Sequence, residues 1–164
     1  MTGGAWLLLY VTCQRLAELA LARRNTRRLL ARGGVERGAG HYPLMVAFHA
    51  LWLAAMWIAG WNAELATAWV APFAVVQILR LWMLASLGER WTTRIIIVDE
   101  PPVRRGPYRF MKHPNYAIVV GEIALVPLCL GAPWLALGVS IAHLGVLAIR
   151  IRAENAALAE YDAG

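Results

Sequence analysis

Five apolar runs, separated by polar or charged segments, set the pattern of the chain. They cover Ala5–Ala22, Leu44–Gly60, Ala68–Leu87, Tyr116–Leu130 and Pro133–Ile149. A helix that crosses the hydrocarbon of a bilayer at right angles needs about 20 residues. The pattern therefore predicts an all-α integral membrane protein with about five transmembrane helices. The last two runs are short and tightly joined, so a shallow hairpin is the alternative to two full crossings.

Composition agrees with this class. Of the 164 residues 60% are apolar and eight are Trp, whereas Lys occurs once. This length suits a single domain. An ordinary soluble domain is excluded by so large an apolar fraction.

The cations lie on one side of the predicted membrane. Six arginines stand in residues 23–37, and six Lys or Arg residues stand in residues 90–112. The loops on the other side, Trp61–Thr67 and Gly131–Pro133, contain no Lys or Arg. By the positive-inside rule, the N-terminus is predicted outside and the C-terminus in the cytoplasm. Arginines beside anionic membrane lipids account for the net charge of +6, so no nucleic-acid partner is predicted.

Ionisable residues inside the apolar runs share one depth. They are Arg15, Glu18, His49, Arg80, Glu122 and His143. All lie in the predicted cytoplasmic half of their spans, roughly 6–10 Å deep at the helical rise. Such groups are costly in a bilayer and normally face one another or a water-filled cavity. A shared depth favours a polar chamber within the bundle.

Other interpretations of this layer stay open. The arginines could extend to the headgroups. Alternatively, Arg15 could pair with Glu18, or Arg80 with Glu122, as structural ion pairs. For the two histidines and Glu122 we favour a cavity open to the cytoplasm.

The longest stretch between spans, Leu87–Asn115, combines a β-branched run with prolines. Thr92–Val98 is predicted to form a short extended segment. The prolines at positions 101, 102, 107 and 114 fix φ and disfavour a helix through them. Within this rigid frame cations alternate with rings, at Tyr108, Arg109, Lys112, His113 and Tyr116. A plain connecting loop rarely needs that combination.

These residue types match the needs of S-adenosylmethionine. Its carboxylate requires cationic donors, its ribose a carboxylate, and its adenine and sulfonium need apolar walls or a π-face. Arg109, Lys112 and His113 are predicted to bind the carboxylate. Tyr108 and Tyr116 are predicted to line the adenine or the sulfonium.

The tail beyond the fifth run supplies the complementary carboxylate. On a helix that continues from this run, His143, Arg150 and Glu154 share one face by their spacing. Glu154 is then predicted to accept hydrogen bonds from the ribose hydroxyls. The alternative is an exposed salt bridge between Arg150 and Glu154 on an amphipathic tail helix.

Several soluble chemistries are excluded by residue spacing. Gly38-Ala39-Gly40 lacks the strand and the βαβ unit of a dinucleotide fingerprint. The four histidines have no metal-site spacing with each other or with cysteine, so no metal is predicted. Cys13 and Cys129 are interpreted as small buried hydrophobic residues.

Two polar segments resemble the isoprenylcysteine carboxyl methyltransferase family. They are Gly106-Pro-Tyr-Arg109 with His113-Pro-Asn-Tyr116, and Arg150-x-Arg-x-Glu154-Asn155-x-x-Leu158. The resemblance implies an integral-membrane enzyme that uses S-adenosylmethionine without a Rossmann domain. It also implies that the two segments enclose the cofactor near the cytoplasmic face, which adds Pro114 and Asn155 to the predicted cofactor-binding residues.

Two positions depart from the family pattern. Lys112 stands where the family usually has Arg, which keeps the charge but loses the planar fork. Asn155 stands where the prenylcysteine enzymes have a second Glu. The second departure argues against carboxyl methylation of prenylcysteine more than against cofactor binding.

The N-terminal half resembles a bacterial branch of that family. The supporting residues are Arg15-Leu-Ala-Glu18-Leu, Arg24-Asn25, Gly33-Gly34-Val-Glu36-x-Gly38 and His41-Tyr42-Pro43 with His49. This branch includes partners of type III polyketide synthases that O-methylate alkylpyrones or alkylresorcinols. We therefore expect a bacterial inner-membrane protein whose active site faces the cytoplasm. Residues 1–87 would form three N-terminal spans, and residues 88–164 the cofactor-binding part of one methyltransferase domain.

The predicted reaction transfers a methyl group to an oxygen of a lipidic acceptor, a long-chain pyrone or a phenolic lipid. Arg150 would orient a carboxylate acceptor, whereas a phenol or enol needs a base, for which His143 or Glu122 is best placed by depth.

Carboxyl methylation of a prenylated thiol and N-methylation of a phospholipid headgroup are alternatives. A non-enzymatic carrier or assembly partner is the alternative from another class, although the outer halves of the spans lack the polar groups of a carrier. The acceptor and the oligomeric state stay open.

Overall fold

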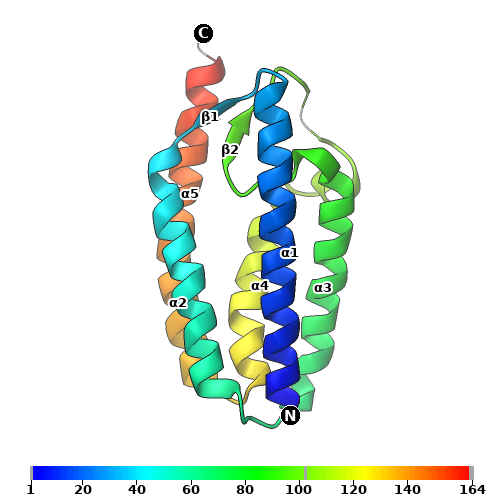
Figure 1. Ribbon diagram of the computed structural model, residues 1–164, viewed down its shortest axis with the longest axis vertical. Coiled ribbons are helices and arrows are strands. Elements are labelled where there is room, and N and C mark those ends of the chain that lie inside the picture. The colour runs from blue at the N-terminus through cyan, green and yellow to red at the C-terminus, as the bar shows by residue number, and fades with distance from the viewer. Residues whose placement is uncertain (1, 102, 163–164) are drawn as a thin grey trace.

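Five α-helices run side by side along the long axis of the molecule in a computed structural model that describes residues 2–101 and 103–162 (Figure 1). The helices are α1 (Gly3–Ala31), α2 (Tyr42–Gly60), α3 (Thr67–Leu87), α4 (Pro114–Cys129) and α5 (Pro133–Asp162). The linkers contain the strands β1 (Val35–Arg37) and β2 (Ile95–Ile97) and the 3₁₀ turns η1 (Ala39–His41), η2 (Gly88–Arg90) and η3 (Gly106–Arg109).

The helices coincide with the predicted apolar runs. Among the described residues, four helices are long and apolar enough to cross a membrane, and α4, with 16 residues, is a shorter apolar helix. The predicted helical class is therefore confirmed, with four or five helices apolar enough to span a membrane where about five spans were predicted. α1 and α5 run well past the predicted ends at Ala22 and Ile149, because their charged extensions contain good helix formers and neither proline nor glycine.

The bundle is apolar inside and outside. α4 packs against both α3 and α5, and α1 contacts α2. The main core comprises Leu8, Val11, Trp52, Met56, Phe73, Ile123, Val126, Cys129 and Leu130. On the outside, Ile58 and Trp134 are 82% and 83% exposed, as side chains that face lipid would be. Cys129 is buried as predicted, but the prediction is wrong for Cys13, which lies on an outward face of α1.

Two long linkers meet at one end of the bundle through a two-stranded sheet. β1 and β2 pair antiparallel, with Val35 opposite Ile97 and Arg37 opposite Ile95. The predicted extended segment at Thr92–Val98 is confirmed, since β2 lies within it. Its partner was not predicted, because a three-residue strand carries too short a pattern to be recognised. The sheet fixes the α1–α2 linker beside the α3–α4 linker.

The proline-rich segment between β2 and α4 contains no α-helix within residues 98–101 and 103–113, as predicted. Pro102 lies outside the described residues. Pro114 occupies the first turn of α4, where a backbone N–H would have no partner within the helix, so its absence in proline costs nothing. Gly106 has φ of +59°, and a Cβ added there would lie 1.9 Å from the Ser86 hydroxyl oxygen. This close crossing of the segment over α3 therefore requires glycine.

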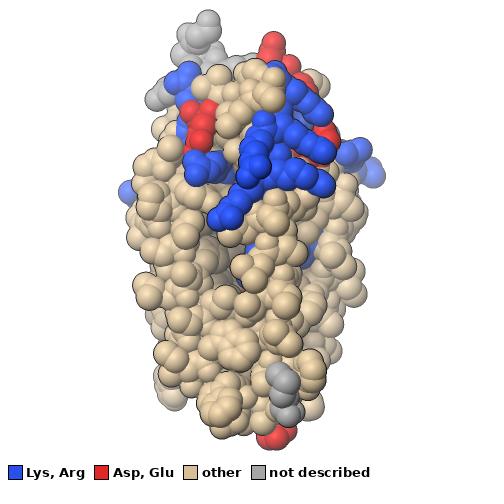
Figure 2. Space-filling model, viewed as in Figure 1, with Lys and Arg blue, Asp and Glu red and all other residues tan. Residues whose placement is uncertain are grey.

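Cations gather at the end of the molecule that carries the sheet. On the face shown in Figure 2, Lys and Arg side chains cluster at the end where β1 and β2 lie in Figure 1. Buried Asn25 of α1 ties this end together, because its Nδ2 donates to the carbonyls of Gly88 at 3.1 Å and Trp91 at 2.9 Å. The polar linkers are thus fixed to the bundle by specific hydrogen bonds.

Candidate functional site

The two motif segments meet at the polar end of α5. Tyr116, in the first turn of α4, donates its hydroxyl hydrogen to Oε2 of Glu154. Oε1 of Glu154 lies 3.7 Å from Nδ1 of His113, whose ring stacks on that of Tyr116 with centroids 5.1 Å apart. Nε of Arg150 donates to the Tyr116 hydroxyl oxygen at 3.2 Å. Arg150 and Glu154 therefore converge on Tyr116 instead of forming the exposed salt bridge that was the alternative.

Arg150 also reaches both polar linkers. Its Nη1 donates to the carbonyl of Thr93 at 2.8 Å and to Nε2 of His41 at 3.2 Å. Nδ1 of His41 contacts the Gly38 carbonyl, so Nδ1 carries the hydrogen and Nε2 is the acceptor. The guanidinium lies 5.9 Å from the centroid of the Tyr116 ring. Arg150 is thereby held at the junction of α4, α5, η1 and the segment that precedes β2.

These side chains line a cavity of about 250 Å³, which we call the motif cavity. Its lining comprises Leu87, Arg90, Trp91, Thr92, Arg94, Ile95, Ile96, Ile97, Tyr108, Lys112, His113, Asn115, Tyr116, Arg150, Glu154 and Leu158. The lining thus has four Lys or Arg residues and one carboxylate, beside apolar and aromatic walls; Arg90 and Arg94 pair with Glu100 and Glu36 outside the lining. Such a cavity suits a ligand that has an anionic group and a flat apolar group.

Most of the predicted site residues line the motif cavity. They are Tyr108, Lys112, His113, Tyr116, Arg150 and Glu154. Pro114 is buried where α4 begins, between His113 and Tyr116 in the chain. Arg109 and Asn155 are exposed and lie outside the lining. The Arg109 guanidinium instead lies 6.0 Å from the Phe110 ring.

The Tyr108 hydroxyl is a neutral group in this cavity. Burial, followed by the charge of the nearby Glu154 carboxylate, raises the pKa of Tyr108. Its hydroxyl therefore stays protonated at neutral pH and keeps a hydrogen to donate.

Several residues of the site were not predicted. Asn115 lines the motif cavity, and its Oδ1 is buried without a hydrogen-bond partner among the described residues. Its place between His113 and Tyr116 was the available signal. Thr93 and His41 fix Arg150 from linkers that are distant in sequence, and no local pattern indicates that contact.

Glu122 lies elsewhere, in a buried ionic cluster of Arg15, Glu18, Arg80 and Glu122. Oε1 of Glu122 accepts from Nε of Arg80 at 2.6 Å and from Nε2 of Gln77 at 2.9 Å. Arg15 pairs with both carboxylates, and Arg80 also pairs with Glu18 at 3.1 Å. Arg80 is 1% exposed and Glu122 is 2% exposed. Both structural pairings that the sequence left open are present, and Glu122 does not line the motif cavity.

His143 lies in a third place, against aromatic rings. Its ring centroid is 5.9 Å from that of His49 and 5.4 Å from that of Phe48. Only 1% of His143 is exposed. It precedes Arg150 by seven residues on α5, which is about 10 Å along the helix axis. The predicted base therefore lies deeper in the bundle than the motif cavity.

Comparisons with known proteins point to the same segments. The model of the isoprenylcysteine carboxyl methyltransferase (ICMT) family matches residues 69–160, which include both motif segments. The chain is 40% identical to "Uncharacterized protein YpbQ" of Bacillus subtilis, over 96% of this chain and 98% of that one. It is 26% identical to an "Uncharacterized protein" of Haemophilus influenzae, over 88% of each chain. No solved structure matches the chain. The family match and the apolar helices together indicate an integral membrane protein.

Proposed function

Since this chain belongs to the isoprenylcysteine carboxyl methyltransferase family, we propose that it is an S-adenosylmethionine-dependent enzyme that methylates an oxygen of a lipidic acceptor. The observation that carries this proposal is the motif cavity. There, two segments that are distant in sequence place cations, aromatic rings and a carboxylate around one space.

The residues of the motif cavity fit S-adenosylmethionine by their chemistry. When bound, this cofactor supplies a methyl group activated by a positively charged sulfur. Lys112 is the donor for its carboxylate. The faces of Tyr108 and Tyr116 favour the sulfonium, and Glu154 accepts hydrogen bonds from the ribose. The Oδ1 of Asn115, which has no partner among the described residues, is a further hydrogen-bond acceptor that suits the amino group of the adenine.

We assign binding of the methyl acceptor to the region around His143, which lies deeper in the bundle than the motif cavity. A hydroxyl acceptor needs a base, and His143 suits that role better than Glu122, because two arginines and Gln77 already engage the Glu122 carboxylate. The rings of Phe48 and His49 beside His143 suit a phenolic or pyrone head. Arg150, between this region and the motif cavity, orients the acceptor oxygen.

Carboxyl methylation of a prenylated thiol is the second candidate, supported by the name of the family. A carboxylate acceptor is already ionised at neutral pH and needs orientation but no base. His143→Ala distinguishes the two reactions. Methylation of a phenol or pyrone should fall strongly in this variant, whereas carboxyl methylation should persist.

We further propose that the end with the motif cavity faces the cytoplasm of a bacterial inner membrane. The concentration of Lys and Arg at this end supports that orientation (Figure 2). Labelling of single cysteines introduced at Arg104 and Glu64, with a reagent that does not cross membranes, tests it. In intact cells only the cysteine at position 64 should react.

Methyl-labelled S-adenosylmethionine tests the function directly. Membranes that contain the chain should transfer the label to long-chain pyrones or phenols, and analysis of the labelled lipid identifies the acceptor. Calorimetry with S-adenosylhomocysteine tests the cofactor site separately. A chain that neither binds this product nor labels any lipid would fit the carrier or assembly alternative instead.

A further inference from the structure

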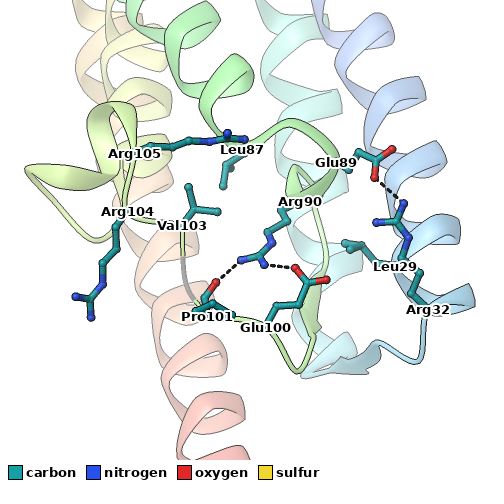
Figure 3. A pocket seen from close by; sticks show the side chains of 10 residues that line it. All are labelled: Leu29, Arg32, Leu87, Glu89, Arg90, Glu100, Pro101, Val103, Arg104 and Arg105. Atoms are coloured by element: carbon teal, nitrogen blue, oxygen red, sulfur yellow. Dashed lines mark hydrogen bonds and ion pairs between the residues drawn. The ribbon is translucent and has the colours of Figure 1, made fainter.

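A second cavity, of about 490 Å³, lies beside the motif cavity and has no role in the proposed methyl transfer. We call it the basic cavity. Its walls come from the end of α1, the end of α3 with η2, and residues 100–101 and 103–105 (Figure 3). Leu87 and Arg90 line both cavities. The two spaces are therefore neighbours at the same polar end of the bundle.

Cations are in excess in the basic cavity. The charged residues in its lining are Arg32, Arg90, Arg104, Arg105, Glu89 and Glu100. The two carboxylates already have partners: Arg32 pairs with Glu89 at 2.7 Å, and Arg90 pairs with Glu100. Two arginines remain whose charge no carboxylate in the lining matches. The basic cavity is thus an anion site by its charge balance.

Arg105 is the better ordered of these two arginines. Its Nε donates to the Ser86 carbonyl at 2.8 Å, which holds the side chain in place while its terminal nitrogens make no recorded hydrogen bond to a described residue. Figure 3 shows Arg105 extending toward Leu87, whereas the Arg104 side chain points away from Arg105 and the other labelled side chains. A guanidinium fixed at Nε still presents its two terminal nitrogens, which is an arrangement suited to phosphate oxygens.

The position of the basic cavity indicates that the anion is part of a lipid. The apolar helix α3 ends at Leu87, which is itself part of the lining, so the cavity lies at the level where hydrocarbon gives way to headgroups. Trp82, five residues earlier on α3, is 45% exposed, as is typical of Trp at a membrane interface. Leu29, Leu87 and Val103 add apolar surface to the walls. A free anion needs no such surface, whereas the glycerol of a phospholipid does.

We propose that the basic cavity binds the phosphate of an anionic phospholipid headgroup. Arg105 is the phosphate donor, Arg104 adds a positive charge, unpaired among the described residues, at the edge of the cavity, and the apolar walls contact the glycerol. This inference concerns a second ligand and stands whether or not the chain methylates a lipid.

Binding of phosphatidylglycerol to the full chain in neutral detergent tests the proposal. We expect saturable binding with a rise in the thermal unfolding midpoint, and neither with phosphatidylcholine. Arg104→Gln should weaken binding about fivefold, the effect of one interfacial cation. Arg105→Gln should weaken it further. Arg24→Gln, a change at an exposed cation of α1 outside the lining, is the matched control and should have less effect.

Three results would overturn the proposal. Equal weakening by Arg24→Gln and Arg104→Gln would mean diffuse attraction to the whole basic surface. Binding of inorganic phosphate as strong as that of phosphatidylglycerol would mean a site for free anions. No preference for phosphatidylglycerol over zwitterionic phosphatidylcholine would mean that the site does not select an anionic headgroup. Arg104 has no recorded partner among the described residues, so its replacement tests the site even if Arg105→Gln disturbs the segment.

Discussion

The buried ionic cluster and the motif cavity contain the same types of charged residue but differ in their roles. In the cluster, two arginines and two glutamates neutralise one another within the bundle, and Gln77 adds a further donor. In the motif cavity, Arg90 and Arg94 pair with carboxylates outside the lining, which leaves Lys112 and Arg150 beside Glu154. The Oδ1 of Asn115 has no hydrogen-bond partner among the described residues. Charges inside a bilayer must be satisfied by the protein itself, whereas a site at the interface can leave groups for a ligand. Charge balance therefore separates a structural cluster from a binding site.

Removal of one charge from the cluster should have the largest effect. Arg80→Met leaves Glu18 and Glu122 with Arg15 as their only cation among the recorded ion pairs. Loss of one partner from a buried ion pair costs about 3–5 kcal/mol. We expect a loss of this size in the free energy of unfolding, measured by denaturation in detergent.

The double variant Arg80→Met with Glu122→Met sharpens this test. It leaves Arg15 and Glu18 as a balanced pair at 3.0 Å, so it should be more stable than Arg80→Met alone. If the single variant is as stable as the wild type, the cluster does not hold the bundle together.

Gly106→Ala should have the next largest effect, and mainly at the motif cavity. The added Cβ would lie 1.9 Å from the Ser86 oxygen, at a φ of +59°. A left-handed backbone costs an L-residue about 1–2 kcal/mol, and the clash adds to this cost. We expect lower stability and weaker binding of S-adenosylhomocysteine, measured by thermal unfolding and calorimetry.

Gly33→Ala is the control for the backbone cost. Gly33 also has positive φ, at +90°, but an added Cβ there would meet nothing within 4 Å. Its variant should lose stability only by the backbone cost and keep its ligand affinity. Equal losses in both variants would show that the crossing at Ser86 does not position the site.

Glu154→Gln should weaken ligand binding without unfolding the bundle. Hydrogen bonds to charged groups contribute about 1.5–3 kcal/mol, or roughly 10- to 150-fold in affinity. Calorimetry with S-adenosylhomocysteine measures this loss. Glu64→Gln, the same chemical change at an exposed residue outside the cavity lining, should leave affinity unchanged. An unaltered affinity in Glu154→Gln would remove the ribose role from Glu154.

The smallest expected effect is a pH dependence at Glu89. Its pKa is lowered from the ordinary value of 4.5, first by the Arg32 hydrogen bond and charge and then by Arg28. Because the pKa of Glu89 is lower in the folded state, its ion pairs stabilise the fold at pH values above the ordinary pKa. This stability is lost as the pH falls through the lowered pKa of the folded state. The unfolding midpoint should therefore fall slightly on acidification from about pH 5 to pH 3, and less in Glu89→Gln. Equal slopes in both proteins would contradict this assignment.

Helices were predictable from the sequence, because mainly apolar runs of 15 to 20 residues have few alternatives. The meeting of His113 with Glu154 was also predictable, from a family pattern on both sides of one hairpin. The partner of Glu122 was not, since a shared depth allows both a cavity and an ion pair, and only the packing of α1, α3 and α4 selects between them. Arg109 shows the same limit: its sequence position fits the motif, yet its side chain turns away from the cavity.

The contacts that the two long linkers make with α5 and with each other could not be predicted. Arg150 bonds to Thr93 and His41 across more than fifty residues of chain, and β1 pairs with β2 through three residues on each side. Neither contact leaves a periodic signal. They depend on which helices are neighbours, which hydrophobic patterning alone does not determine.

The continuity of α5 has a mechanical consequence. One rigid helix joins the hairpin at Pro133 to Glu154, a distance of about 32 Å at the helical rise. A tilt of about 5° at the hairpin would displace the far end by about 3 Å, which is a full hydrogen-bond length. Helices tilt when the thickness of their bilayer changes. The geometry around Tyr116 is therefore mechanically linked to the thickness of the surrounding membrane.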